Sequence, residues 1–211
     1  MTEQEGVTKY DLKFSPSAPL DTALLQELNH WRSILTKLEL IGRHAHRYQG
    51  IGFGNLSRRL HPGKLDFAVT GTQTGHLAQL DERHYAIVTH CDALANRLTA
   101  KGPIAPSSES LTHGQLYTLL PKVNFAFHVH SPDIWRAAER LDIPTTQPNA
   151  AYGTPEMVTE VERLLKEKDI ASRRIFSMGG HEDGVISFGA SADEAGTTLL
   201  TYLKRSTETS A

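Results

Sequence analysis

Two histidines in this sequence are spaced so that both could bind one metal ion. His128 and His130 stand in the run Phe127-His128-Val129-His130, at the end of an apolar segment, 123–129, that is rich in strand-forming residues. Because side chains alternate between the faces of a strand, the two imidazoles should project from the same face. Imidazoles held by a rigid strand are typical zinc ligands. A His-x-His pair also occurs at ordinary strand ends, so the pair alone predicts at most half of a metal site.

A third histidine and a glutamate stand in segments that could join this pair. His181 follows two glycines in the run Met-Gly-Gly-His-Glu-Asp-Gly over 178–184, and glycines let the backbone approach another group closely. The same run would suit a hairpin with His181 exposed at its tip. Glu109 follows Pro106-Ser107-Ser108 at the expected start of a helix, where the helix dipole favours an anion. This arrangement is also typical of a simple helix cap, and His113 could be a partner of Glu109 on the same helical face or a surface residue.

Two further segments have the composition of anion-binding loops. They are Gly54-Asn55-Leu56-Ser57 and Thr70-Gly71-Thr72-Gln73-Thr74-Gly75, which offer small residues, hydroxyl groups and backbone N–H groups. Neither matches a nucleotide-binding loop, because neither carries a Gly-Lys-Ser/Thr or a Gly-x-Gly-x-x-Gly with an acidic residue at the required distance. By composition alone, such segments are more often ordinary turns.

The elements that must position these residues alternate along the chain. Apolar residues at three- and four-residue spacing predict helices over 21–42, from 108, over 132–141, over 155–168 and over 191–202. Apolar, β-rich runs predict strands at 65–69, 87–89, 97–99, 123–129, 174–178 and 185–188. This interleaving favours a single layered α/β domain over residues 21–211, after a loose lead-in over residues 1–20.

Composition narrows the class of protein. Of the 211 residues, 39% are hydrophobic and 22% charged, with a net charge of −2, which is typical of a globular domain. The absence of a basic run argues against a nucleic-acid partner, and no apolar run approaches the ~20 residues of a membrane-spanning helix. The polar N-terminus does not resemble a signal peptide, and the single cysteine, Cys91, fits a reducing compartment. We therefore expect a cytoplasmic protein with no membrane partner.

Taken jointly, the motifs resemble the class II aldolase/adducin family. They follow that family's order over roughly residues 25–204: Gly54-Asn55-Leu56-Ser57, Val69-Thr70-Gly71-Thr72, Ser107-Ser108-Glu109 with His113, His128-Val129-His130, Tyr152-Gly153-Thr154 and Gly180-His181-Glu182-Asp183-Gly184. The resemblance implies a three-layer α/β/α sandwich around a mixed, mainly antiparallel sheet. It also implies a homotetramer with the active site near a subunit interface.

The resemblance further implies a role for each matched residue. His128, His130 and His181 would be the metal ligands, with Zn²⁺ as the expected cofactor and another divalent transition metal as the alternative. Glu109 would move protons. The phosphate of a small sugar-phosphate-like substrate would be bound by Asn55, Gly71, Thr72, Ser107 and Ser108.

The implied function is that of a zinc-dependent aldehyde-lyase, an aldolase, acting on a small ketose phosphate or related hydroxy-ketone through a metal-stabilised enediolate. A sugar-phosphate dehydratase or 4-epimerase of the same family stays an alternative. So does a non-catalytic adducin-like scaffold, although the three histidines and Glu109 argue against it. Two departures leave the substrate open: the segment 143–152 is shorter than in fuculose-phosphate aldolases, and Glu182-Asp183 follows His181 where sugar-phosphate aldolases commonly carry His-His-Gly.

Overall fold

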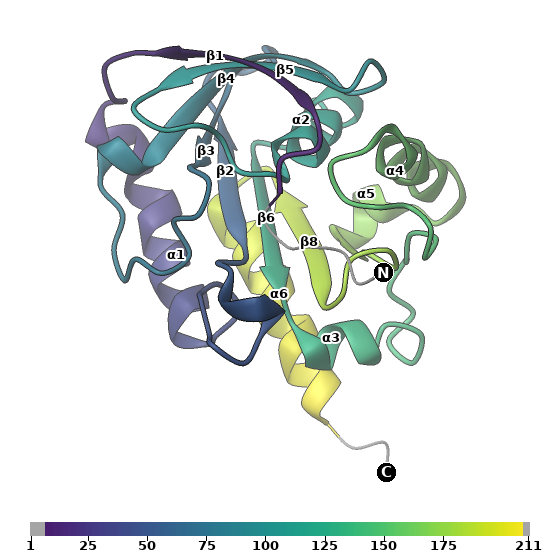
Figure 1. The fold of residues 1–211 in the computed structure, drawn as a ribbon. Helices are drawn as coiled ribbons and strands as arrows, with labels where there is room; N and C mark the ends of the chain where they lie inside the picture. The colour runs from purple at the N-terminus through teal and green to yellow at the C-terminus, as the bar shows by residue number, and fades with distance from the viewer. Residues whose placement is uncertain (1–6, 209–211) are drawn as a thin grey trace.

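A single eight-stranded sheet runs through the chain in the computed structural model, which describes residues 7–208 (Figure 1). The strand order is β1-β5-β4-β3-β2-β6-β8-β7. Among these strands β1 and β5 pair in parallel and every other neighbouring pair is antiparallel. The strands are β1 (Asp11–Pro16), β2 (Asn55–Arg59), β3 (Phe67–Thr70), β4 (Tyr85–Asp92), β5 (Arg97–Gly102), β6 (Phe125–His130), β7 (Ile175–Ser177) and β8 (Gly184–Gly189).

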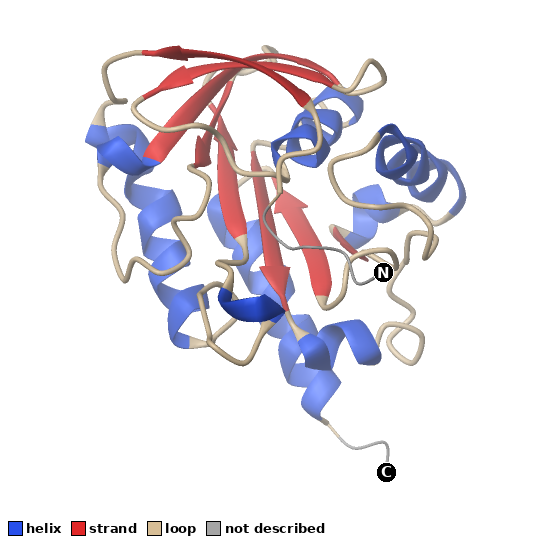
Figure 2. Cartoon of the chain, in the orientation of Figure 1, coloured by secondary structure: helices blue, strands red, loops and turns tan. Residues whose placement is uncertain are grey.

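Helices cover both faces of this sheet (Figure 2). On one side, α1 (Gln26–Lys37), α3 (Pro132–Arg136) and α6 (Ala192–Thr207) share a core cluster with Phe125, Phe127 and Val129 of β6. On the other side, α2 (Ser110–Leu119), α4 (Pro155–Glu167) and α5 (Ile170–Arg173) share a second cluster with Ala126 of the same strand. The chain is thus a three-layer α/β/α sandwich around a mixed, mainly antiparallel sheet, as expected. Three short 3₁₀ helices join these elements: η1 (Thr22–Leu25), η2 (Tyr48–Gly50) and η3 (Glu82–His84).

Two strands lie where the sequence analysis expected irregular structure. β1 occupies residues 11–16 of the expected loose lead-in, which is a correction for that segment, while residues 1–6 lie outside the described part of the chain. β1 is an edge strand in which only Leu12 and Phe14 are half-buried, so its apolar pattern is too short to detect. β2 begins at Asn55, within a predicted loop, and its buried positions include Ser57 and Arg59. Buried polar residues hide the alternation by which strands are predicted.

Helix boundaries also differ in places from those predicted. The helix expected over 21–42 is divided into η1 and α1 and ends at Lys37, and α3 ends at Arg136 rather than near residue 141. Ser131 caps α3, because its side chain accepts a hydrogen bond from the Ile134 N–H. None of the helices within residues 7–208 has the length and apolar character needed to cross a lipid bilayer.

Candidate active site

Strand β6 presents His128 and His130 on one face in the middle of the sheet. It lies between β2 and β8, and both histidines are completely buried. They point away from the cluster formed by Phe125, Phe127 and Val129, as the alternation of side chains requires. The two ring centroids lie 5.0 Å apart. Strand β6 therefore presents both histidines on the same face, as the sequence predicted.

His181 completes a group of three histidines. It lies in the turn between β7 and β8, and its ring centroid lies 5.1 Å from that of His128 and 4.7 Å from that of His130. One ring nitrogen from each residue can be chosen so that all three lie within 4.8 Å of one another. Three imidazole nitrogens at this spacing could hold one divalent metal ion and leave further coordination positions open.

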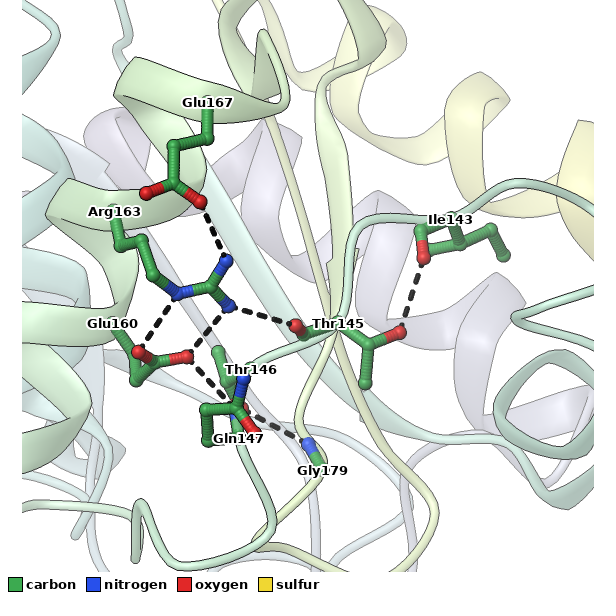
Figure 3. Close-up of polar contacts among 8 residues, drawn as sticks. All are labelled: Ile143, Thr145, Thr146, Gln147, Glu160, Arg163, Glu167 and Gly179. Atoms are coloured by element: carbon green, nitrogen blue, oxygen red, sulfur yellow. Dashed lines mark hydrogen bonds and ion pairs between the residues drawn. The ribbon is translucent and has the colours of Figure 1, made fainter.

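The turn that carries His181 is packed closely against a neighbouring segment, 143–150. The Gly179 N–H donates a hydrogen bond to Thr146 Oγ1 at 3.0 Å. The guanidinium of Arg163 on α4 donates hydrogen bonds to the Glu160 carboxylate and to the carbonyl oxygen of Thr145 (Figure 3). A Cβ atom at Gly179 or Gly180 would lie 2.2 Å from the carbonyl oxygen of Thr146 or Ala150. Only glycine allows this approach. His181 is consequently 3% exposed and is not the exposed hairpin tip that its sequence also allowed.

Burial sets the protonation state of the two histidines on β6. It lowers the pKa of both His128 and His130 well below the ordinary value, and the neighbouring His181 lowers both further. The neutral imidazole is the form that binds a metal. Both ring nitrogens of His128 and the Oδ1 atom of Asn55 are buried without a hydrogen-bond partner in the described chain. Buried polar atoms normally have partners. The nitrogens of His128 therefore fit a metal ion, and the Oδ1 atom of Asn55 fits a polar ligand.

Glu109 lies beside the three histidines. It immediately precedes α2, is completely buried, and places Oε1 3.5 Å from His181 Nδ1. Its Oε2 accepts a hydrogen bond from Thr112 Oγ1 at 3.2 Å. The side chain makes no capping hydrogen bond to the helix, so capping does not explain its position. A buried carboxylate beside a group of histidines that could hold a metal ion can exchange protons with a molecule bound there.

His113 is neither a surface residue nor hydrogen-bonded to the Glu109 side chain. It is completely buried, and its Nδ1 lies 2.6 Å from Ser57 Oγ, which is itself 2.7 Å from the Tyr117 hydroxyl. Burial lowers the pKa of His113 to about 3, so the ring is neutral. His113 therefore contacts β2 through Ser57.

The residues expected to bind phosphate line one pocket. Asn55, Gly71, Thr72, Ser107 and Ser108 share this pocket, which we call the anion pocket; its other lining residues are Gly52, Gly54, Gln73, Thr74 and Gly75. Two strand-like contacts hold its walls together: the Thr72 N–H donates to the Ala105 carbonyl at 2.9 Å, and the Ser107 N–H donates to the Thr70 carbonyl at 3.2 Å. Asn55 stands opposite His128 in the β2–β6 ladder. The anion pocket therefore adjoins the histidine group.

Two tyrosines beside the histidines were not identified as site residues from the sequence. The Tyr152 ring is buried and its centroid lies 4.5 Å from that of His181; Tyr152 belongs to a motif noted above, which was the available signal. The Tyr48 ring lies 4.5 Å from that of His130, and its hydroxyl donates to Asp183 Oδ2 at 2.6 Å. Nothing in the local sequence marks Tyr48. Its backbone is left-handed, with φ of 48°, a conformation that tertiary contacts must impose.

Comparison with known proteins identifies the family. Residues 43–209 match the family described as Class II Aldolase and Adducin N-terminal domain. The chain belongs to this family. Among curated relatives, methylthioribulose-1-phosphate dehydratase of Stenotrophomonas maltophilia is 30% identical over 135 residues, 62% of this chain and 55% of the relative. The same enzyme of Xanthomonas oryzae pv. oryzae is 34% identical over 87 residues, 41% of this chain and 35% of the relative. The chain thus spans about half the length, or less, of these relatives.

Several solved structures share the fold. L-fuculose-1-phosphate aldolase from Thermus thermophilus superposes with a TM-score of 0.63 at 19% identity, covering 88% of this chain and 92% of that one. A sugar-phosphate aldolase from Thermotoga maritima gives a TM-score of 0.64 at 14% identity, covering 87% of this chain and 92% of that one. At these identities the likeness concerns the sandwich architecture alone.

Proposed function

We propose that the chain is a metal-dependent lyase acting on a small phosphorylated ketose. The observation that carries this proposal is the juxtaposition of two binding features. A buried group of three histidines with Glu109 adjoins a pocket of hydroxyl groups and glycines, and the pairing of Asn55 with His128 joins the two. A ketose phosphate has a carbonyl for the first feature and a phosphate for the second. Family membership gives the proposal independent support.

The side chains would divide the work between binding and proton transfer. His128, His130 and His181 would hold a divalent ion, for which Zn²⁺ is our choice because all three donors are nitrogen. When bound, such an ion supplies Lewis-acid stabilisation of negative charge developing on the substrate's carbonyl oxygen. Glu109 would accept or return the proton that moves during the reaction. Asn55, Gly71, Thr72, Ser107 and Ser108 would orient the phosphate, so that the reacting carbon faces Glu109.

Two reactions fit this arrangement, and the curated relatives favour one of them. In dehydration, Glu109 removes a proton from the carbon beside the carbonyl, the C–H electron pair forms a C=C bond, and the next carbon loses its hydroxyl as water. In aldol cleavage, the bond between those two carbons breaks instead, after the distal hydroxyl loses its proton. Relatives at 30% and 34% identity are named dehydratases, whereas the aldolases are related through the fold. We therefore place dehydration first and aldol cleavage second.

A product analysis separates these reactions. Zinc-loaded protein would be incubated with methylthioribulose 1-phosphate and with fuculose 1-phosphate, and the products resolved by mass spectrometry. Dehydration gives a product lighter than its substrate by one water, and aldol cleavage gives two fragments. Glu109→Gln should bind as much zinc as the wild type and form neither product. If the wild type binds zinc yet changes neither substrate nor any other ketose phosphate, the lyase proposal is wrong and an adducin-like scaffold becomes the better account.

The assembly and the cellular location are proposals of the same kind. The family resemblance supports a homotetramer, and the composition supports a cytoplasmic protein that binds a small molecule rather than nucleic acid. Light scattering on the purified protein would measure its mass directly. A monomeric particle that retains full activity would contradict an active site completed at a subunit interface.

A further inference from the structure

A buried arginine lies directly behind the wall of the anion pocket. Arg32 belongs to the buried stripe of α1 and is 2% exposed. Its guanidinium donates to three backbone carbonyl oxygens in the segment 74–78, namely those of Thr74 at 3.1 Å, Leu77 at 2.7 Å and Ala78 at 3.4 Å. This segment runs from β3 towards β4 across α1 (Figure 1). Thr74 also lines the anion pocket, so a single residue separates the guanidinium from the pocket.

The positive charge of Arg32 has no carboxylate partner in the part of the chain that the structure describes. The hydrogen bonds of its guanidinium there go to the three carbonyl oxygens, which are dipoles and not charges. Burial lowers the pKa of Arg32, and the nearby Tyr85 partly offsets this effect. Buried charges in proteins are ordinarily paired. A buried guanidinium held only by carbonyls is therefore available to compensate an anion from elsewhere.

Arg59 shows what the same arrangement looks like away from the pocket. It is 4% exposed and its guanidinium also donates to three carbonyl oxygens, those of Lys64, Tyr117 and Val123. Burial lowers the pKa of Arg59 too, and the nearby Tyr117 and the carboxylate of Asp66 partly offset this effect. Arg59 does not line or contact the anion pocket. The two arginines match in burial, in hydrogen bonding and in the direction of their pKa shifts. They differ in location and in the carboxylate of Asp66 near Arg59.

The lining of the anion pocket carries no formal charge. Its ten residues are glycine, serine, threonine, asparagine and glutamine, with no lysine, arginine or histidine among them. A phosphate dianion bound there would receive hydrogen bonds but no positive charge from the lining. Attraction between opposite charges is several times stronger in a protein interior than in water, so a guanidinium behind the wall would act on it.

We propose that Arg32 is a positioning residue for the substrate phosphate, holding the Thr74 side of the anion pocket in place and supplying the positive charge that its lining lacks. This inference rests on the phosphate-binding part of the proposed function and not on the type of reaction. It also assigns a role to α1 residue 32, which lies outside the residues that match the family, 43–209.

The test compares the two arginines on zinc-loaded protein with inorganic phosphate as the probe. Calorimetry would give the phosphate Kd of wild type, Arg32→Met, Arg32→Lys, Arg59→Met and Arg59→Lys, and metal content would be measured alongside. We expect Arg32→Met to weaken phosphate binding about tenfold or more. Arg32→Lys should recover part of the loss, because lysine keeps the positive charge but not the planar set of guanidinium N–H donors. The Arg59 variants should lose thermal stability and keep the phosphate Kd within about twofold of wild type.

Several outcomes would overturn the proposal. It fails if wild type does not bind phosphate, or if the Arg32 and Arg59 variants change Kd equally. If Arg32→Met does not fold, the phosphate Kd of Arg32→Lys is compared with that of Arg59→Lys instead. An unchanged Kd in Arg32→Lys counts against the positioning role of the guanidinium N–H donors. Where a substrate is available, Arg32→Lys should raise KM for the phosphorylated ketose and leave KM for its phosphate-free analogue unchanged. Because the phosphate Kd is measured without turnover, this proposal can fail while the lyase proposal stands, and the reverse.

Discussion

The histidine group and the anion pocket adjoin each other but are built in different ways. The histidine group consists of three buried side chains, two held by strand β6 and one by the turn between β7 and β8. The anion pocket consists of backbone and short side chains from the start of β2 and two loops. In the first, the chemistry depends on the type of three residues. In the anion pocket, binding depends on the shape of the backbone, to which many residues contribute.

This difference determines how each half should respond to substitution. Removal of one of three ligands removes a large part of the coordination, whereas removal of one hydroxyl from a pocket with ten lining residues leaves most of the contacts in place. The five predictions that follow test this contrast, and they are given from the largest expected effect to the smallest.

Replacement of His130 by alanine should abolish metal binding. Two histidines cannot hold a zinc ion as three do, and we expect the affinity to fall by more than about 100-fold. Metal content of the purified protein, measured by mass spectrometry, checks this. His90→Ala is the matched control, because His90 is an exposed histidine on β4. Equal zinc in the two variants would show that the histidine group is not the metal site.

Replacement of Glu109 by glutamine should separate metal binding from turnover. The amide keeps the size of the buried side chain but cannot accept a proton, so turnover should fall about 10²- to 10⁴-fold while zinc content is retained. Glu139→Gln, at an exposed glutamate, is the control. A rate within a few-fold of wild type would remove Glu109 from the proton-transfer role.

Replacement of Gly75 by alanine should damage the anion pocket through its backbone. The added Cβ would lie 2.4 Å from the Gly42 carbonyl oxygen and 3.0 Å from Gly52 Cα. Such overpacking costs about 1–3 kcal/mol, and we expect a weaker phosphate Kd with unchanged metal content. Gly63→Ala is the control: its φ of 74° makes alanine strained, but its Cβ would meet nothing within 4 Å. An undisturbed phosphate Kd in Gly75→Ala would mean that the loop shape does not govern the pocket.

The buried His113 should make the metal-free protein less stable in acid. Its pKa is about 3 in the folded chain because of burial, against 6.5 in the unfolded chain. As pH falls below 6.5 the unfolded chain gains a proton that the folded chain does not, so stability is lost, by about 1 kcal/mol for each pH unit. Urea unfolding of wild type and His113→Gln at pH 7.5 and 5.5 measures the slope. His113→Gln should flatten it and His90→Gln should not; equal slopes would contradict the buried neutral state.

Replacement of Ser108 by alanine should have the smallest effect of the five. One hydroxyl hydrogen bond contributes about 1 kcal/mol, so KM for a phosphorylated ketose should rise about fivefold with kcat nearly unchanged. Steady-state kinetics with a phosphate-free analogue provides the control, since its KM should not move. A loss as large as that of His130→Ala would break the contrast between the two halves.

Local patterns were enough for the parts of the site that depend on one segment. His128 and His130 share a face because side chains alternate on a strand, and Ser131 caps α3 because its hydroxyl reaches a nearby N–H. Repeated apolar spacing likewise predicted the α/β class and most helices. The assignment of His181, Glu109 and the pocket residues needed the joint order of motifs in the family, because each motif alone also suits a turn or a helix cap.

Tertiary structure decided the contacts between segments that are distant in the chain. Asn55 stands opposite His128 through strand register, Arg32 reaches the segment 74–78 from another layer, and Tyr48 meets Asp183 across 135 residues. β1 joins the sheet through pairing with β5, although its own apolar pattern is short. The amino-acid sequence by itself determined the residue types, the periodicity and the α/β class, because these depend on neighbours in the chain. Register, burial and the positions of Arg32, Tyr48 and Tyr152 arose only when packing brought remote segments together, since their energies come from those contacts.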